Sequence, residues 1–92
     1  MIYKIRSGIV MEHVCGTYFL VSTLEARAFC PYFKRLNPTA AFFWSLLEQG
    51  MDKEQMVREA AEHYYTSEDR VRPGLEAFLS SLIQTNYIIV QE

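Results

Sequence analysis

The side chains that could carry out catalysis or bind a metal are few in this sequence, and they are scattered. The cysteines, Cys15 and Cys30, form no Cys-x-x-Cys pair, and neither His13 nor His63 stands at a matching metal-site spacing. The chain also lacks a nucleophilic Gly-x-Ser-x-Gly turn, a phosphate-binding loop and paired carboxylates in an apolar setting. We therefore predict no catalytic residue, no metal site and no cofactor. Both cysteines are interpreted as reduced thiols, with a disulfide or a shared metal as the alternative.

The composition is that of one folded domain spanning residues 1–92. Half of the residues are apolar and 14 % are aromatic, which suffices for a hydrophobic core. The net charge is −2 with acids and bases mixed, whereas a general nucleic-acid surface needs a basic stripe. No apolar run approaches the roughly 18–20 residues of a membrane span, and the N-terminus lacks a signal-peptide pattern. We expect a cytoplasmic protein that contacts neither nucleic acid nor membrane.

The clearest local signal is the start of a central helix. Asn37 suits the N-cap position and Pro38 the first helical position. The helix that follows is apolar on nearly every side around residues 42–44, which is typical of a central helix. Gly50 is expected to cap its C-terminal end. Residues 32–36, just before it, are predicted to form a short strand.

The N-terminal third favours β-structure. Residues 8–14 and 17–22 are predicted to form an antiparallel hairpin, with Gly16 supplying the positive backbone angle of the turn. Residues 2–6 are interpreted as an edge strand or a frayed arm. Residues 23–31 are interpreted as a loop or a single helical turn before the third strand.

The C-terminal half predicts two more helices. Asp52 stands at capping-box spacing before Gln55, and residues 66–67 cap the third helix. Inside that helix, residues 73–74 are Pro-Gly. Either the helix is kinked near residue 73, or the regular helix begins at Arg72 after an irregular turn; we favour the second. Residues 87–90 should form an extended tail against the sheet or the helices.

This order predicts an α+β fold, a three-stranded antiparallel sheet followed by a three-helix bundle, similar to a winged helix-turn-helix. Such a shape suggests DNA binding. In the third helix, however, Arg70 and Arg72 stand beside Glu68, Asp69 and Glu76, so the positive and negative charges nearly cancel and leave little attraction for DNA phosphates. Peptide binding fits better. The strand over residues 32–36 is short and charged like an edge strand, and an exposed edge can pair with an extended peptide. From the residues alone, an ordinary edge strand without a ligand is the simpler interpretation.

The sequence resembles the PqqD-like family, named after the coenzyme PQQ biosynthesis protein D and also called RiPP precursor peptide recognition elements. Four stretches carry the likeness, and together they cover nearly the whole chain. The most specific is the Leu-Asn step at residues 36–37 into the aromatic helix, and the others are residues 8–18, 52–65 and 75–82.

The resemblance implies three strands followed by three helices, no enzymatic activity, and binding of the leader region of a ribosomally made precursor peptide. The family presents this leader to a modifying enzyme, often a radical S-adenosylmethionine enzyme, and the peptide typically joins the sheet beside the third strand and lies in a groove against the third helix. A homodimer is left open, and the alternative function is a DNA-binding or protein–protein interaction module. Carried onto this chain, the implied peptide-binding residues are Tyr32, Phe33, Lys34 and Arg35 on the strand and Arg72, Glu76, Leu79 and Ile83 on the helix.

Overall fold

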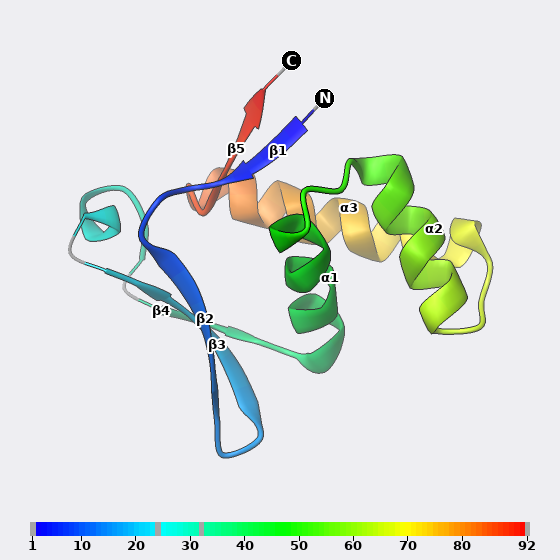
Figure 1. Cartoon of the computed structure of the whole chain (residues 1–92), viewed down its shortest axis with the longest axis horizontal. Helices are drawn as coiled ribbons and strands as arrows, with labels where there is room; N and C mark the ends of the chain where they lie inside the picture. Colours follow the sequence, from blue (N-terminus) through cyan, green and yellow to red (C-terminus); the bar gives the residue numbers. More distant parts are fainter. Residues whose placement is uncertain (1, 24, 32, 92) are drawn as a thin grey trace.

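The computed structural model describes residues 2–23, 25–31 and 33–91, and it confirms the α+β fold. These residues form two antiparallel sheets, three α-helices and one 3-10 turn, and Figure 1 shows the three α-helices grouped to one side of the β2–β3 hairpin. The strands are β1 (Ile2–Ile5), β2 (Ile9–Val14), β3 (Thr17–Ser22), β4 (Phe33–Leu36) and β5 (Ile88–Gln91). The helices are η1 (Ala26–Ala28, one 3-10 turn), α1 (Pro38–Glu48), α2 (Lys53–His63) and α3 (Glu68–Gln84).

The three-stranded sheet has the order β2-β3-β4, so β3 is central and β4 is an edge strand. Its register places Leu20 opposite Lys34 and Val21 opposite Phe33. Because successive side chains of a strand point to opposite faces, each strand presents one side to the helices and one side outward. On the helix side, Leu20 and Leu36 are buried in the core.

A second sheet pairs the two ends of the chain. β1 and β5 are antiparallel, from Ile2 opposite Gln91 to Ile5 opposite Ile88. Tyr3 and Ile88 are buried, so this ribbon closes one side of the core, and Figure 1 shows it next to the end of α3. The sequence predicted extended structure for both segments but not their pairing with each other.

The central helix α1 begins where the sequence predicted. The Asn37 side chain accepts a hydrogen bond from the backbone N–H of Ala40 at 2.7 Å, and Pro38 occupies the first helical position. Trp44 is completely buried in the core. Gly50, with φ of +81°, follows the C-cap, and its N–H donates to the Leu47 carbonyl in a Schellman-type ending.

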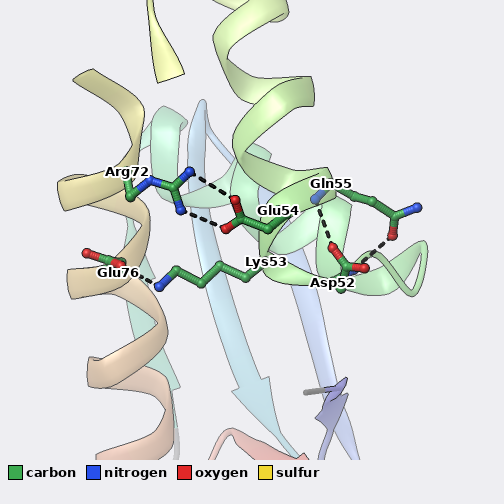
Figure 2. Close-up of polar contacts among 6 residues, drawn as sticks. All are labelled: Asp52, Lys53, Glu54, Gln55, Arg72 and Glu76. Atoms are coloured by element: carbon green, nitrogen blue, oxygen red, sulfur yellow. Dashed lines mark hydrogen bonds and ion pairs between the residues drawn. The ribbon is translucent and has the colours of Figure 1, made fainter. Parts of the chain in front are cut away.

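Helix α2 also starts as predicted. The Asp52 side chain accepts from the backbone N–H of Gln55 at 2.9 Å, while the Gln55 side chain accepts from the backbone N–H of Asp52 at 3.0 Å. This reciprocal capping box is drawn in Figure 2.

The start of α3 corrects a prediction. The sequence favoured a regular helix from Arg72, but the helix is continuous from Glu68, behind a Ser67 cap, and contains Pro73. The proline removes only one intrahelical hydrogen bond, and both Pro73 and Gly74 are exposed, so water can satisfy the carbonyl left without its partner. None of the helices, as far as the chain is described, is long and apolar enough to cross a bilayer.

Candidate functional site

The β4 edge divides its side chains between the two faces of the sheet. Lys34 is half-buried and points toward the helices on the same face as Leu36, which is buried. Phe33 is 56 % exposed and lies with Arg35 on the outward face. The register therefore separates the predicted strand residues into one that faces α3 and two that do not. Tyr32, the fourth, lies outside the described residues.

Lys34 directly links β4 to α3. Its ammonium group donates a hydrogen bond of 3.4 Å to the Ser81 hydroxyl. The two residues are far apart in sequence, so this contact identifies which side of α3 faces the edge strand. We call this region, made of Phe33, Lys34, Arg35 and Ser81, the β4 edge site.

A set of hydrogen bonds, which we call the clamp, holds the segment before β4 against the residues that follow α3. Its Ser22, Cys30 and Tyr87 side chains are buried, whereas Asn86 is exposed. The Cys30 thiol lies 2.9 Å from the Asn86 carbonyl, and the Asn86 side-chain amide donates to the Phe29 carbonyl at 3.0 Å. The Pro31 carbonyl accepts from the hydroxyl groups of Tyr87, at 3.2 Å, and Ser22, at 2.6 Å. These bonds fix where β4 begins relative to α3, and so they position the β4 edge site.

Burial also changes the proton affinity of two clamp residues. It raises the pKa of the Cys30 thiol, an effect that Arg6 partly offsets. Burial likewise raises the pKa of the Tyr87 hydroxyl, with the nearby Cys30 adding to it. Both groups therefore stay neutral over a wider pH range than in water. Cys15 is exposed and Cys30 is buried, and both are free thiols in this structure.

The helix residues that the family resemblance implied lie on a different side of α3. The Arg72 guanidinium donates to both Glu54 carboxylate oxygens, at 2.7 and 3.0 Å, and Lys53 forms an ion pair with Glu76. Figure 2 shows both pairs bridging α3 to the first turn of α2. The hydrogen bonds from Arg72 lower the pKa of the Glu54 carboxyl.

Leu79 and Ile83 continue along this same side. Leu79 is buried, and Ile83 is 40 % exposed. Together with Glu76 they line part of a hollow of about 440 Å³ that also includes Tyr3 of β1 and Lys53 of α2. The four predicted residues thus share one face, but that face meets β1 and α2.

Helical geometry explains the difference. At 3.6 residues per turn, the four predicted residues lie about 140–180° around α3 from Ser81. Gly74, Ala77 and Phe78 lie within about 60° of Ser81 by the same rule. Three of the residues on the Ser81 side, Gly74, Ala77 and Ser81, are small, and this spacing of small side chains is the signal that sequence reasoning missed. A side chain added at Gly74 would meet nothing within 4 Å, so the helix is open there.

Across the described ranges, no group of three or more His, Cys, Asp or Glu side chains is placed to hold a metal ion. The side chains of the β4 edge site are a cation that faces α3, a hydroxyl, an aromatic ring and an exposed guanidinium. With the backbone of an edge strand, such a set can bind a chain by hydrogen bonds and charge.

Comparison with known proteins agrees with the fold. The family model of the coenzyme PQQ synthesis protein D (PqqD) matches residues 32–88, well over half of the chain. The chain belongs to the PqqD family. The match covers β4, all three helices and the first residue of β5, and therefore includes the β4 edge site. A search of curated proteins finds no match.

Two solved structures share this PqqD-family fold. One is TbiB1 in complex with the TbiA(beta) leader peptide, with a TM-score of 0.78 and 22 % sequence identity over 97 % of this chain and 98 % of that one. The other is a lasso peptide synthetase B1 complexed with the leader peptide, with a TM-score of 0.77 and 16 % identity over 96 % of this chain and 98 % of that one.

Proposed function

We propose that this protein is a non-catalytic adaptor that binds the leader region of a ribosomally made precursor peptide by strand addition at β4. The observation that carries the proposal is that β4 is a sheet edge whose inward cation, Lys34, contacts α3 through Ser81. An added strand pairs with the free N–H and C=O groups of such an edge and places alternate side chains toward the helix and outward. The leader-peptide complexes of the two structurally similar proteins and membership of the PqqD family support it.

The proposed binding residues are those of the β4 edge site, with Gly74, Ala77 and Phe78 beside Ser81 on α3. On the strand, the proposed residues are those that the family resemblance implied. On α3, we propose the residues on the Ser81 side in place of those that the resemblance implied, because Arg72 and Glu76 are already paired with α2.

Lys34 gives this site a chemical preference. Among the described residues it has no carboxylate within ion-pair distance, and its only partner there is the Ser81 hydroxyl. An Asp or Glu side chain on the face of the added strand turned toward α3 would form a charge-assisted hydrogen bond with it. We therefore expect the leader to carry an acidic residue opposite Lys34.

The test is a titration with leader peptides encoded beside the gene, followed by amide chemical shifts. Strand addition predicts shifts in residues 33–36 and along α3 between Gly74 and Ser81. Shifts confined to other parts of the chain would contradict the site. In calorimetry, Lys34→Met should weaken binding roughly tenfold through loss of a charged hydrogen bond. Lys4→Met, an exposed lysine on β1, is the matched control and should bind like the unchanged protein.

The modifying enzyme that receives the peptide is the second partner of the proposal, and the reaction is placed in the cytoplasm. A radical S-adenosylmethionine enzyme is the partner that family resemblance favours. The second similar protein is itself called a lasso peptide synthetase B1, so an enzyme of lasso peptide synthesis is the alternative partner. Co-purification with each class of enzyme encoded nearby, with and without leader peptide, separates the two.

A further inference from the structure

Five of the eight outward-facing residues of the β2-β3-β4 sheet are apolar, although none of the described α-helices lies on this face (Figure 1). An antiparallel sheet that packs one face on the core normally turns polar side chains to water on the other. Here Val10 is 43 % exposed, Val14 53 % and Phe33 56 %. Phe19 and Val21 of the central strand β3 lie on the same face and are half-buried. We call the face made by these five side chains the outer sheet face.

One row of this face carries opposite charges on either side of an aromatic ring. Glu12 of β2 and Arg35 of β4 both stand directly opposite Phe19 of the central strand β3. Both charged residues are exposed. Neither forms an ion pair with any residue that the structure describes. From β2 to β4, this row therefore consists of a negative charge, an aromatic ring and a positive charge.

We propose that a second copy of this chain covers the outer sheet face, with a two-fold axis that lies between the two sheets and runs parallel to β3. Rotation about this axis places β2 of one copy over β4 of the other. Glu12 then faces Arg35 of the second copy, and Arg35 faces Glu12 of the second copy, at both ends of the row. An axis across the strands would instead set Glu12 against its own equivalent, so the charges select one of the two symmetric arrangements.

The apolar side chains match in the same arrangement. The neighbouring row contains Val10, Val21 and Phe33, so Val10 covers Phe33 of the second copy and Val21 meets its own equivalent. Sheets that stack face to face are rotated by about 30° relative to each other. At one strand spacing of about 4.8 Å from the axis, this rotation shifts the charged pairs by only about 2.5 Å, within reach of Glu and Arg side chains.

The size of the face predicts how strong the dimer is. β2 and β3 have six residues each and β4 has four, so the face spans roughly 14 Å by at most about 20 Å, or about 260 Å² of projected area per copy. This is well below the roughly 800 Å² of accessible surface per partner that standard specific interfaces bury, so we expect a weak dimer that dissociates on dilution.

The experiment is sedimentation equilibrium of the purified chain from roughly 10 μM to 1 mM, the range in which interfaces of this size associate. The proposal predicts a mass that rises toward that of a dimer with concentration. Glu12→Arg and Arg35→Glu should each shift the dissociation constant at least tenfold toward monomer, because each creates two like-charge contacts. The double variant E12R/R35E should restore association, because the row is then charged in the opposite sense.

The controls separate this interface from general charge effects and from misfolding. Glu48→Arg changes the net charge as Glu12→Arg does, but at an exposed position at the end of α1, and it should associate like the unchanged protein. Circular dichroism must show each variant folded. A chain that is monomeric throughout the range would overturn the proposal and leave the face to another protein. Single variants that dimerise normally, or a folded double variant that stays monomeric, would overturn it as well.

Discussion

The two halves of helix α3 are held in place by different kinds of contact. Its N-terminal half is joined to α2 by two exposed ion pairs, Arg72–Glu54 and Lys53–Glu76, and contains Pro73. The residues that follow its C-terminal end, Asn86 and Tyr87, are fastened by the clamp, around the buried Tyr87 ring, to the segment before β4. Surface ion pairs contribute little to stability, whereas buried side chains and their hydrogen bonds contribute much. The proposed peptide site thus depends on the firmly held end of the helix.

The largest expected effect comes from removing the centre of the clamp. Tyr87 is fully buried, so Tyr87→Ala should lower the free energy of unfolding by about 3–5 kcal/mol. Tyr87→Phe keeps the ring and removes only the hydrogen bond to Pro31, so it should cost about 1 kcal/mol. Urea unfolding curves measure both changes. Equal effects of the two variants would mean that the ring itself contributes nothing.

A smaller effect is expected at Asn86, where backbone and side chain can be separated. Its φ of +66° is left-handed, and its side chain bonds the Phe29 carbonyl. Asn86→Gly removes only the side-chain bond, and it should cost about 1 kcal/mol. Asn86→Ala adds backbone strain and should cost about 1 kcal/mol more. Thermal unfolding would reveal the order, and an alanine variant as stable as the glycine variant would argue against strain.

In the other half of α3, a substitution should increase stability. Gly74 is exposed, its conformation is helical, and an added methyl group meets no neighbour. Gly74→Ala should therefore raise the free energy of unfolding by about 1 kcal/mol and the melting temperature by a few degrees. Ala77→Gly, the reverse change one turn later, should lower it by a similar amount. A destabilised Gly74→Ala would show that this half of the helix is not regular in solution.

The smallest expected change in stability comes from the ion pairs. Their contribution to stability is lost in acid, whereas that of the clamp is lost in alkali. Because the pKa of Glu54 is lowered by Arg72, the stabilisation by this pair is present at neutral pH and is lost as the pH falls through that lowered pKa. Arg72→Gln should be slightly less stable than the unchanged protein at pH 7 in low salt. The difference should vanish in acid and shrink in high salt.

At the clamp, the raised pKa values of Tyr87 and Cys30 make folding stability depend on pH in the alkaline range. Below the ordinary pKa values of these groups, both are neutral in the folded and the unfolded chain. As the pH rises above those values, the unfolded chain loses protons first, and folding stability falls. Unfolding curves recorded from about pH 2 to about pH 11 for the unchanged protein, Arg72→Gln and Tyr87→Phe test both halves together. Arg72→Gln should flatten the acid side of the profile, and Tyr87→Phe the alkaline side.

The parts of the fold that were predictable are those governed by neighbours in sequence. Asn37, Asp52 and Ser67 cap their helices as expected, because a cap depends on a side chain and a backbone group three residues away. The pairing of β1 with β5 joins residues near opposite ends of the chain, and no local pattern encodes such a contact.

The same limit explains the candidate site. The charge and shortness of β4 pointed to an edge strand because both are properties of the strand itself. The side of α3 that faces β4 is a tertiary property. A helical stripe such as Glu76, Leu79 and Ile83 shows which residues share a face but not which element covers it. Pro73 misled the prediction of where α3 begins, because local propensity is a weak guide when packing holds the helix.

The pairing of β1 with β5 also has a consequence for engineering. Because Ile2 lies opposite Gln91, the two ends of the chain emerge side by side. A short flexible linker could therefore join them into a ring, and new ends could be opened at the exposed hairpin turn around Gly16. Such a circular permutant would keep β4, α3 and the clamp continuous in sequence while moving the chain ends to the far tip of the hairpin.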